Sequence, residues 1–424
     1  MILDLICRRP LALAALAAML VSGLGATWSR AATGGGDIGR PMSAAPAVTL
    51  PQPGASRSLS GVACPAPDDC WAVGSYQTAK GATMNMVLRW EGMGWQGVHS
   101  PTPGPGGALT AISCPAKGVC WTAGQTIGTV QTGPRNEVLR WLGSAWGLRP
   151  VPSRQSLCDD CNYSLSAIKC PSITNCIASG TAGSADEYYY QALRRTAAGW
   201  SAGKITSDTW GGDAEQGVNG LDGIACLTAA NCWAVGNTGC NGDCSGGSDV
   251  VVHWNGVEWT KVKVPSPGDI KDYGTGPRLD GVACTSGSNC WAVGFSYDSQ
   301  GDTVNQILRW NGTAWLATPA PGQASGDTTS LTAVACTSAS NCWAVGSGDH
   351  ATNEILQWNG LTWRQVDAPT PGAPDAGYPS ALAGVACSSS TSCWAVGSYA
   401  YHAKDRQAFN QALYWNGSRW SLVY

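Results

Sequence analysis

Aromatic and acidic residues that gather in several segments of the chain have the chemistry of sugar binding. Tyrosine and tryptophan rings stack on sugar rings, and neighbouring carboxylates and imidazoles hydrogen-bond the hydroxyls. The densest such segment contains Asp186, Glu187, Tyr188 and Tyr190. The other candidates are Trp210, Tyr273, Tyr297, Asp298, His350, Tyr401 and His402. The alternative, that these are ordinary solvated loop residues, stays open at this point.

Four cysteines lie in two short motifs near these candidates. Cys158 and Cys161 form CDDC, and Cys240 and Cys244 form CNGDC. Four thiolates are a ligand set for zinc, whereas in an oxidising compartment the same residues form two disulfides. We favour the disulfides, because the rest of the cysteine pattern also indicates oxidation. No metal site and no cofactor are therefore expected.

The remaining cysteines, apart from Cys7, form a repeated motif that organises the chain. Cys-x5-Cys occurs as Cys64/Cys70, Cys114/Cys120, Cys170/Cys176, Cys226/Cys232, Cys284/Cys290, Cys336/Cys342 and Cys387/Cys393. Successive motifs begin 50 to 58 residues apart, a period typical of propellers, solenoids and arrays. Each pair is expected to form a disulfide that closes a hairpin, worth about 2 kcal/mol by loop-closure entropy.

A second signature, Trp-x4-Trp, follows six of the seven cysteine motifs and is usually written WNGxxW. It occurs at Trp90/Trp95, Trp141/Trp146, Trp254/Trp259, Trp310/Trp315, Trp358/Trp363 and Trp415/Trp420. The third unit departs from the pattern at two positions. Arg195 replaces the first tryptophan of the pair, whereas Trp200 is retained, and Ile177 replaces the tryptophan that follows the second cysteine in the other units. This departure marks either a specialised site or sequence drift.

One repeat accommodates four strands, predicted at 331–336, 342–346, 354–359 and 362–368. Each is short and rich in β-forming residues, and Asn-Gly between the last two favours a tight hairpin turn. Gly346 is expected to end its strand, and Trp343 to pack between repeats. The predicted fold is all-β: a seven-bladed β-propeller of four-stranded antiparallel blades over 57–424, with one Cys-x5-Cys disulfide per blade.

The N-terminus is typical of an export signal. Arg8 and Arg9 precede an apolar stretch at 11–25, which is short for a membrane span. We predict a signal peptide at 1–31, with an uncleaved anchor as the alternative, and a linker at 32–56. Residues 47–54 are interpreted either as an edge strand on the last blade or as part of the linker. A secreted or cell-surface monomer without a membrane span in the mature chain is expected.

Composition excludes one class of partner and leaves the activity open. The net charge is −3 with no basic block, so nucleic acid is not expected as a partner. On its cysteine and WNGxxW motifs, 57–424 resembles secreted bacterial propellers of the kelch/galactose-oxidase-like and Asp-box (BNR) groups. The WNGxxW turn is similar to a relaxed Asp box. The resemblance implies the fold, and propellers host lectins, hydrolases, oxidases and scaffolds alike.

The sequence favours a binding or interaction module for carbohydrate or a surface protein. Its site is predicted on the face that carries the loops between the second and third strands and between consecutive blades, because these loops vary most. The alternatives are a glycan-active enzyme, sialidase-like or another glycosidase, on the same face, and a purely structural envelope protein. Arg89, Arg140, Arg194 and Arg309 share one repeated strand position and are interpreted as structural. No catalytic residue is assigned.

Overall fold

The computed structural model describes residues 51–128, 133–152, 162–183, 188–202, 220–238, 247–265, 276–321, 326, 328–371, 380–400 and 407–423. The chain divides into two units, Met1–Pro46 and Ala47–Tyr424, and every described residue belongs to the second. Within these residues the chain is almost entirely β-structure, with one short 3-10 helix, η2 (Asp349–Ala351).

Seven antiparallel sheets of four strands each make up this unit, which confirms the predicted propeller. Blades 1 to 3 are β1 (Ser56–Ala66), β2 (Asp69–Gln77), β3 (Thr83–Trp90), β4 (Trp95–Gly97); β5 (Gly106–Ala116), β6 (Val119–Ile127), β7 (Arg135–Trp141), β8 (Trp146–Leu148); and β9 (Asn162–Lys169), β10 (Cys176–Gly183), β11 (Tyr188–Thr196), β12 (Gly199–Ala202). Blades 4 and 5 are β13 (Gly220–Thr228), β14 (Asn231–Thr238), β15 (Ser248–Trp254), β16 (Trp259–Lys261); and β17 (Arg278–Ser286), β18 (Asn289–Tyr297), β19 (Thr303–Trp310), β20 (Trp315–Ala317). Blades 6 and 7 are β21 (Ser330–Ser338), β22 (Asn341–Gly348), β23 (Thr352–Trp358), β24 (Trp363–Gln365); and β25 (Ala381–Ser389), β26 (Ser392–Ala400), β27 (Ala408–Trp415), β28 (Trp420–Val423).

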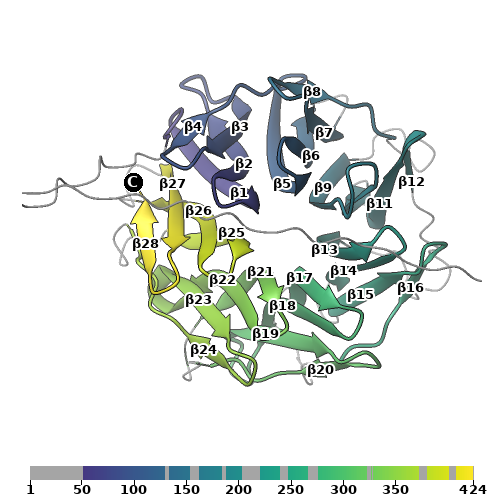
Figure 1. Cartoon of the computed structure of the whole chain (residues 1–424), viewed down its shortest axis with the longest axis vertical. Helices are drawn as coiled ribbons and strands as arrows, with labels where there is room; N and C mark the ends of the chain where they lie inside the picture. The colour runs from purple at the N-terminus through teal and green to yellow at the C-terminus, as the bar shows by residue number, and fades with distance from the viewer. Residues whose placement is uncertain are drawn as a thin grey trace, which may run out of the picture. The chain divides into compact units, whose positions relative to one another are not determined.

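The strands of each blade, called a to d in chain order, run from the centre of the ring outwards, with β1, β5 and their counterparts innermost (Figure 1). Because neighbouring strands are antiparallel, the a–b and c–d turns lie at one end of each blade. The b–c loops and the connections between blades lie at the other end. The two ends are therefore separate faces, as the sequence predicts.

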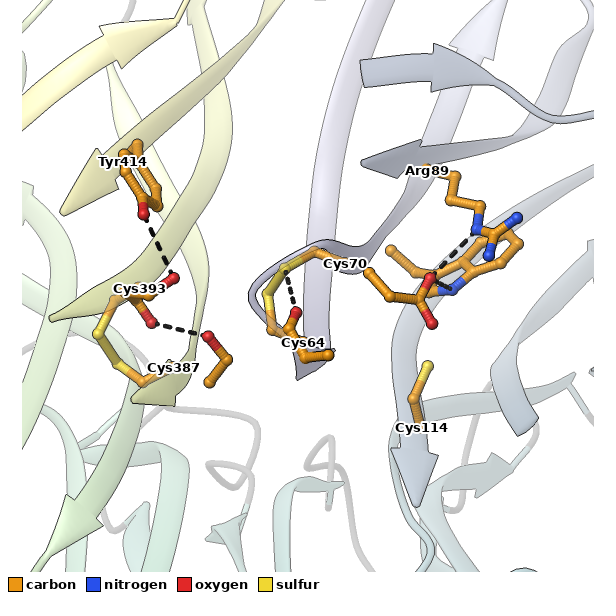
Figure 2. The surroundings of a disulfide bond; sticks show 12 residues. Cys64, Cys70, Arg89, Cys114, Cys387, Cys393 and Tyr414 are labelled. Carbon is orange, nitrogen blue, oxygen red and sulfur yellow. Dashed lines mark hydrogen bonds and ion pairs between the residues drawn. A yellow bond between two sulfur atoms is a disulfide. The ribbon is translucent and has the colours of Figure 1, made fainter. Parts of the chain in front are cut away.

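A disulfide closes the a–b hairpin of every blade, as predicted. Cys336 and Cys342, for example, are direct partners across β21 and β22, with their Cα atoms 4.0 Å apart. Figure 2 shows two of these bonds, in blades 1 and 7, each within its own hairpin. The seven bonds join Cys64 to Cys70, Cys114 to Cys120, Cys170 to Cys176, Cys226 to Cys232, Cys284 to Cys290, Cys336 to Cys342 and Cys387 to Cys393.

The second cysteine of each pair belongs to the hydrophobic core. Each lies on strand b, is fully buried and packs in a cluster between two blades; these residues are Cys70, Cys120, Cys176, Cys232, Cys290, Cys342 and Cys393. Their sulfurs are out of reach of any ligand. The seven disulfides therefore anchor the a–b hairpins in the core between blades.

Gly346 lies inside a strand rather than at its end, which corrects the sequence-based expectation. Strand β22 continues to Gly348, and Gly346 faces Leu331 next to a β-bulge in β21. A Cβ atom at Gly346 would lie 1.9 Å from the Ser330 carbonyl oxygen. The repeated glycine is therefore required by the close approach of strand a at the bulge.

The ring closes through contacts between the two ends of the described chain. Strand β1 packs against β25, β26 and β27 of the last blade. Residues ahead of β1 add hydrogen bonds, since Gln52 exchanges two with the backbone of Asn410, at 2.9 and 3.0 Å, and the Asn410 side chain donates to the Pro51 carbonyl at 3.0 Å. In blade 1, Pro101 and Thr102, which follow strand d, bond Asn85 in the same way. The segment ahead of β1 thus gives the strand-c asparagine of blade 7 the hydrogen bonds that Asn85 of blade 1 receives from the residues after its own strand d.

The hydrophobic core lies between blades, as seven separate clusters that each join two neighbours. At most interfaces a strand-b tryptophan packs on the Trp-x4-Trp pair of the next blade. Trp343, which is fully buried, lies 4.7 Å from Trp415 and 5.2 Å from Trp420 between ring centroids. Five interfaces contain this triad, with strand-b members Trp71, Trp233, Trp291, Trp343 and Trp394.

A buried row of polar pairs also joins the strand-c positions of neighbouring blades. Asn136 of β7 and Gln191 of β11 exchange two amide hydrogen bonds, at 2.6 and 3.0 Å. Asn353 of β23 and Gln411 of β27 do the same at 2.8 and 3.0 Å. Each amide of such a pair donates one N–H to its partner and accepts one in return, while the glutamine nitrogen also donates to backbone carbonyls, as Gln411 does to Ala381 and Ser398.

Glu137 occupies the glutamine position at the interface between blades 1 and 2. The Asn85 amide donates to Glu137 Oε1 at 2.6 Å, but Asn85 Oδ1 and Glu137 Oε2 have no hydrogen-bond partner. A Cβ atom at Gly107 would lie within 2.9 Å of both oxygens, so the two face the same point. Burial raises the pKa of Glu137 to about 8, against the opposing effect of the bond from Asn85. The protonated carboxyl reproduces the amide pair, since its O–H donates to Asn85 Oδ1.

Asp249 repeats this substitution of acid for amide between blades 4 and 5. Gln306 donates to Asp249 Oδ2 at 2.5 Å, while Asp249 Oδ1 and Gln306 Oε1 lack partners. Burial is again the main cause that raises the pKa of this carboxyl, here to about 7.

Candidate functional site

The tryptophan triad is broken at the interface between blades 2 and 3. Strand b of blade 2 supplies Trp121, but Arg195 of β11 stands where the first tryptophan of the pair would be. The Arg195 guanidinium lies 4.5 Å from the Trp121 ring centroid, and Trp200 completes the contact edge-on at 5.9 Å. A planar cation thus replaces a planar aromatic ring, which keeps the stacking but fills less space.

Hydrogen bonds fix the position of Arg195. Its Nη1 donates to the carbonyls of Ile173 and Thr174 in the a–b turn of its own blade, at 3.4 and 2.5 Å. Tryptophans at this position in other blades serve the same turn, as when Trp358 Nε1 donates to the Ala339 carbonyl at 3.0 Å. Arg195 therefore inherits the structural contacts of the residue it replaces and retains further N–H groups for other partners.

A cavity of about 560 Å³ opens beside this substitution. Its walls come from the outer part of blade 2 and the c–d hairpin of blade 3, and include Trp121, Trp200, Arg140, Arg149, Arg195 and Pro150. The volume lies in the range typical of small-ligand sites. Trp121 forms the buried floor, and Trp200 and the three arginines are half-buried. The cavity therefore combines apolar ring surfaces with guanidinium donors.

The three guanidiniums of the cavity influence one another electrostatically. The pKa of Arg195 is lowered, first by burial and then by the positive charges of Arg140 and Arg149. Arg140 also lies over the Trp121 ring, at 5.2 Å from its centroid, and its buried Nε has no partner. The residues that line the cavity include no carboxylate.

The interface between blades 3 and 4 also lacks a complete triad, but it leaves almost no space. Ile177 replaces the strand-b tryptophan and packs against Trp254 and Trp259. The hollow beside it measures about 10 Å³, which is room for one water molecule at most. The two departures of blade 3 thus differ in consequence, and only Arg195 accompanies a sizeable cavity among the described residues.

Four of the candidate residues predicted from the sequence have described side chains, and the structure does not bring them together. Tyr190 packs into the core between blades 3 and 4, and its hydroxyl donates to the Asn237 carbonyl at 3.4 Å. Tyr297 ends β18 beside Phe295. Asp298 accepts backbone N–H bonds within its own b–c loop. His350 lies in η2, 85% exposed, with an ion pair of 2.9 Å to Asp349.

The other candidates cannot be placed in the same way. Tyr188 begins β11, and nothing is described of its side chain. Asp186, Glu187, Trp210, Tyr273, Tyr401 and His402 lie outside the described residues, as do Cys158, Cys161, Cys240 and Cys244. The ligand-binding role of this set and the two loop disulfides stay predictions.

An ionic cluster lies on the strands of blades 4 and 5 nearest the centre of the ring. Arg278 of β17 forms ion pairs with Asp222 of β13 at 3.2 Å and with Asp280 at 2.5 Å. Burial raises the pKa of Asp280 to about 6 and also raises the pKa of Asp222, although Arg278 opposes both shifts. The cluster balances much of its own charge, so we interpret it as a structural network between blades. Within the described part of the chain, no three His, Cys, Asp or Glu side chains form a metal-binding group.

Sequence reasoning missed the cavity for a specific reason. Arg140 belongs to a repeated position, and its structural interpretation holds for Arg89, which pairs with Asp69 at 3.1 Å (Figure 2). The residues that could have indicated the cavity are the neighbours of Arg140 and not Arg140 itself. Val119 and Leu142 occupy the positions of the two acids that bind Arg89, and Arg195 adds a second cation.

Fold and site together define a disulfide-bonded seven-bladed β-propeller with a cationic, tryptophan-lined cavity at one blade interface. No protein-family model matches the chain, and no curated protein matches it either. Similar solved structures include YCF48 bound to a D1 peptide, with 12% identity, 83% of this chain and 96% of that chain covered, and a TM-score of 0.49. A GH74 xyloglucanase from Xanthomonas campestris has 15% identity, 87% and 56% covered, and a TM-score of 0.49. The fucose-specific lectin from Aleuria aurantia has 12% identity, 89% and 96% covered, and a TM-score of 0.42.

These likenesses concern the propeller fold alone. Membership of the kelch or Asp-box groups is not confirmed by them. Among the described residues, the structure contains no helix of the length and hydrophobicity needed to cross a bilayer.

Proposed function

We propose that this protein is an extracytoplasmic binding module whose ligand is a carbohydrate, bound in the cavity between blades 2 and 3. The observation that carries the proposal is the composition of that cavity, in which Trp200 and Pro150 adjoin the N–H groups of Arg140, Arg149 and Arg195. Sugars present apolar ring faces and polar edges, and such a surface matches both. Seven hairpin disulfides fit a protein that folds and works in an oxidising compartment.

Binding without hydrolysis is the function that the cavity supports. Glycosidases ordinarily place two carboxyl groups on either side of the scissile bond, and the cavity walls contain no carboxylate. The rigid surroundings also suit binding, because Arg195 is held at both its stacked face and its Nη1. A site whose donors are fixed before the ligand arrives loses less entropy on binding.

The test is retention of the exported chain on a panel of soluble polysaccharides by affinity gel electrophoresis. We expect retardation on at least one glycan, and its loss in Trp200→Leu. Trp363→Leu is the matched control, because Trp363 holds the same strand-d position in an intact triad of blade 6. Circular dichroism must show that both variants are folded.

Three results would overturn the proposal. They are the absence of retardation on every glycan, undiminished retardation of folded Trp200→Leu, and the release of reducing sugar by the wild-type chain. Retention of an envelope protein without any glycan binding would instead support the surface-protein alternative.

A further inference from the structure

Comparison of blades 1 and 2 shows that Arg140 lacks the two acidic partners of Arg89, its counterpart in blade 1. In blade 1, Arg89 forms ion pairs with Asp69 at 3.1 Å and with Glu91 at 2.6 Å. The aligned positions in blade 2 are Val119 and Leu142. Arg140 therefore keeps the strand position and the stacking of Arg89 but has lost both of its anions.

Two further cations join Arg140 instead of an acid. Arg149 follows strand d of blade 2 and is anchored by its backbone N–H, which donates to the Val138 carbonyl at 2.9 Å. Arg195 comes from the next blade. Among the described residues, no carboxylate forms an ion pair with any of these three arginines. Three half-buried positive charges in one cavity repel one another, and an anion among them relieves that repulsion.

The donors are also of the kind that an oxyanion requires. A guanidinium presents its N–H groups in a planar fork that binds carboxylate or sulfate oxygens in pairs. The guanidinium carbons of Arg140 and Arg195 both lie against the Trp121 ring, at 5.2 and 4.5 Å from its centroid. Arg140 Nε is buried without a partner. Trp200 and Pro150 provide apolar wall beside these groups.

We propose that the cavity between blades 2 and 3 is specific for an anionic saccharide, whose carboxylate or sulfate binds among Arg140, Arg149 and Arg195 while its ring packs on Trp200. This inference rests on the proposed function and adds the chemical class of the ligand. A neutral glycan would leave the three charges uncompensated, so the acidic group supplies selectivity as well as affinity.

The experiment compares polysaccharides that differ only in charge. The pairs are polygalacturonate and its fully methyl-esterified form, hyaluronan and its carboxyl-reduced form, and dextran sulfate and dextran. We expect at least one acidic member to bind at least tenfold more tightly than its neutral partner, with affinity that falls as salt rises. Carboxylate and sulfate sources are distinguished by which pair shows the difference.

Variants then assign the selectivity to the cavity. Arg149→Gln is expected to weaken the acidic member about tenfold or more, the effect of one lost hydrogen bond to a charged group. Arg309→Gln is the control for the loss of one arginine elsewhere on the same protein, because Arg309 lies at the intact interface of blades 5 and 6, and it should leave binding unchanged.

The outcomes separate the two proposals. Equal or tighter binding of the neutral members would overturn the anionic specificity and leave the carbohydrate-binding function standing. Acidic binding that Arg149→Gln does not reduce would show polyanion adsorption elsewhere and overturn this inference. Failure to bind any glycan would overturn both.

Discussion

Replacing Glu137 by glutamine should stabilise the propeller at high pH and leave its stability at low pH nearly unchanged. Glu137 is fully buried, and its pKa is raised from 4.5 to about 8. The folded chain therefore holds this proton where the unfolded chain has released it. Stability falls as pH rises from 4.5 to about 8 and levels off above that value.

The magnitude follows from the two pKa values of Glu137. Each pKa unit between the folded and unfolded chains is worth about 1.4 kcal/mol, so ionised Glu137 costs about 4 to 5 kcal/mol above pH 8. The variant Glu137→Gln would avoid this cost, because a neutral amide pairs with Asn85 as Gln191 pairs with Asn136. For a unit the length of Ala47–Tyr424, this difference corresponds to a rise in Tm of about 6 °C.

The assay measures the thermal unfolding of the wild-type chain and of Glu137→Gln by calorimetry, at pH values from 4 to 9 and with the disulfides intact. The two Tm values should agree at pH 4, diverge as the pH rises to about 8, and differ by a constant amount above that value. Gln191→Glu is the reciprocal control, since it places an acid in the neighbouring pair and should make stability more dependent on pH. Parallel curves for the wild-type chain and Glu137→Gln at all pH values would show that the pKa of Glu137 is not raised in the folded chain.

Three further substitutions test the packing of the ring, each by the change in unfolding free energy or Tm. Gly346→Ala should destabilise the fold by about 3 kcal/mol, because the new Cβ meets the Ser330 carbonyl oxygen at 1.9 Å; a neutral effect would show that the bulge relaxes freely. Gln52→Ala should cost about 1 to 2 kcal/mol through the loss of two hydrogen bonds to Asn410, and wild-type stability in this variant would mean that the segment does not secure blade 7. Trp343→Ala should cost about 3 to 5 kcal/mol, because the side chain is fully buried between two blades; a loss below about 1 kcal/mol would contradict the triad as core.

The repeat made the architecture predictable from the sequence. Cys-x5-Cys recurs in all seven blades and Trp-x4-Trp in six, and each motif corresponds to a local hairpin whose two strands are close in the chain. Such contacts are recorded in sequence spacing. The position of Gly346 was harder to predict, because the bulge that requires it depends on how β21 and β22 pair, and the same glycine would suit a strand end.

The cavity could not be predicted from any one repeat, since its walls come from two blades. Arg140 taken alone is a repeated strand residue, and Arg195 taken alone is an irregularity of blade 3. Their meeting depends on the ring placing β7 beside β11. The sequence candidates were chosen by residue type on variable loops, and Asp298 shows the weakness of that criterion, because it shapes its own loop by accepting backbone N–H bonds.

The most direct test of the account is a single variant, Arg195→Trp, studied for both stability and binding. The substitution restores the tryptophan found at this position in blades 1, 2, 4, 5, 6 and 7 and should rebuild the triad with Trp121 and Trp200. We predict a Tm equal to or above that of the wild-type chain, together with loss of retention on the glycan that the wild-type chain binds. A folded Arg195→Trp protein that binds this glycan with wild-type affinity would contradict the claim that the missing tryptophan creates the site.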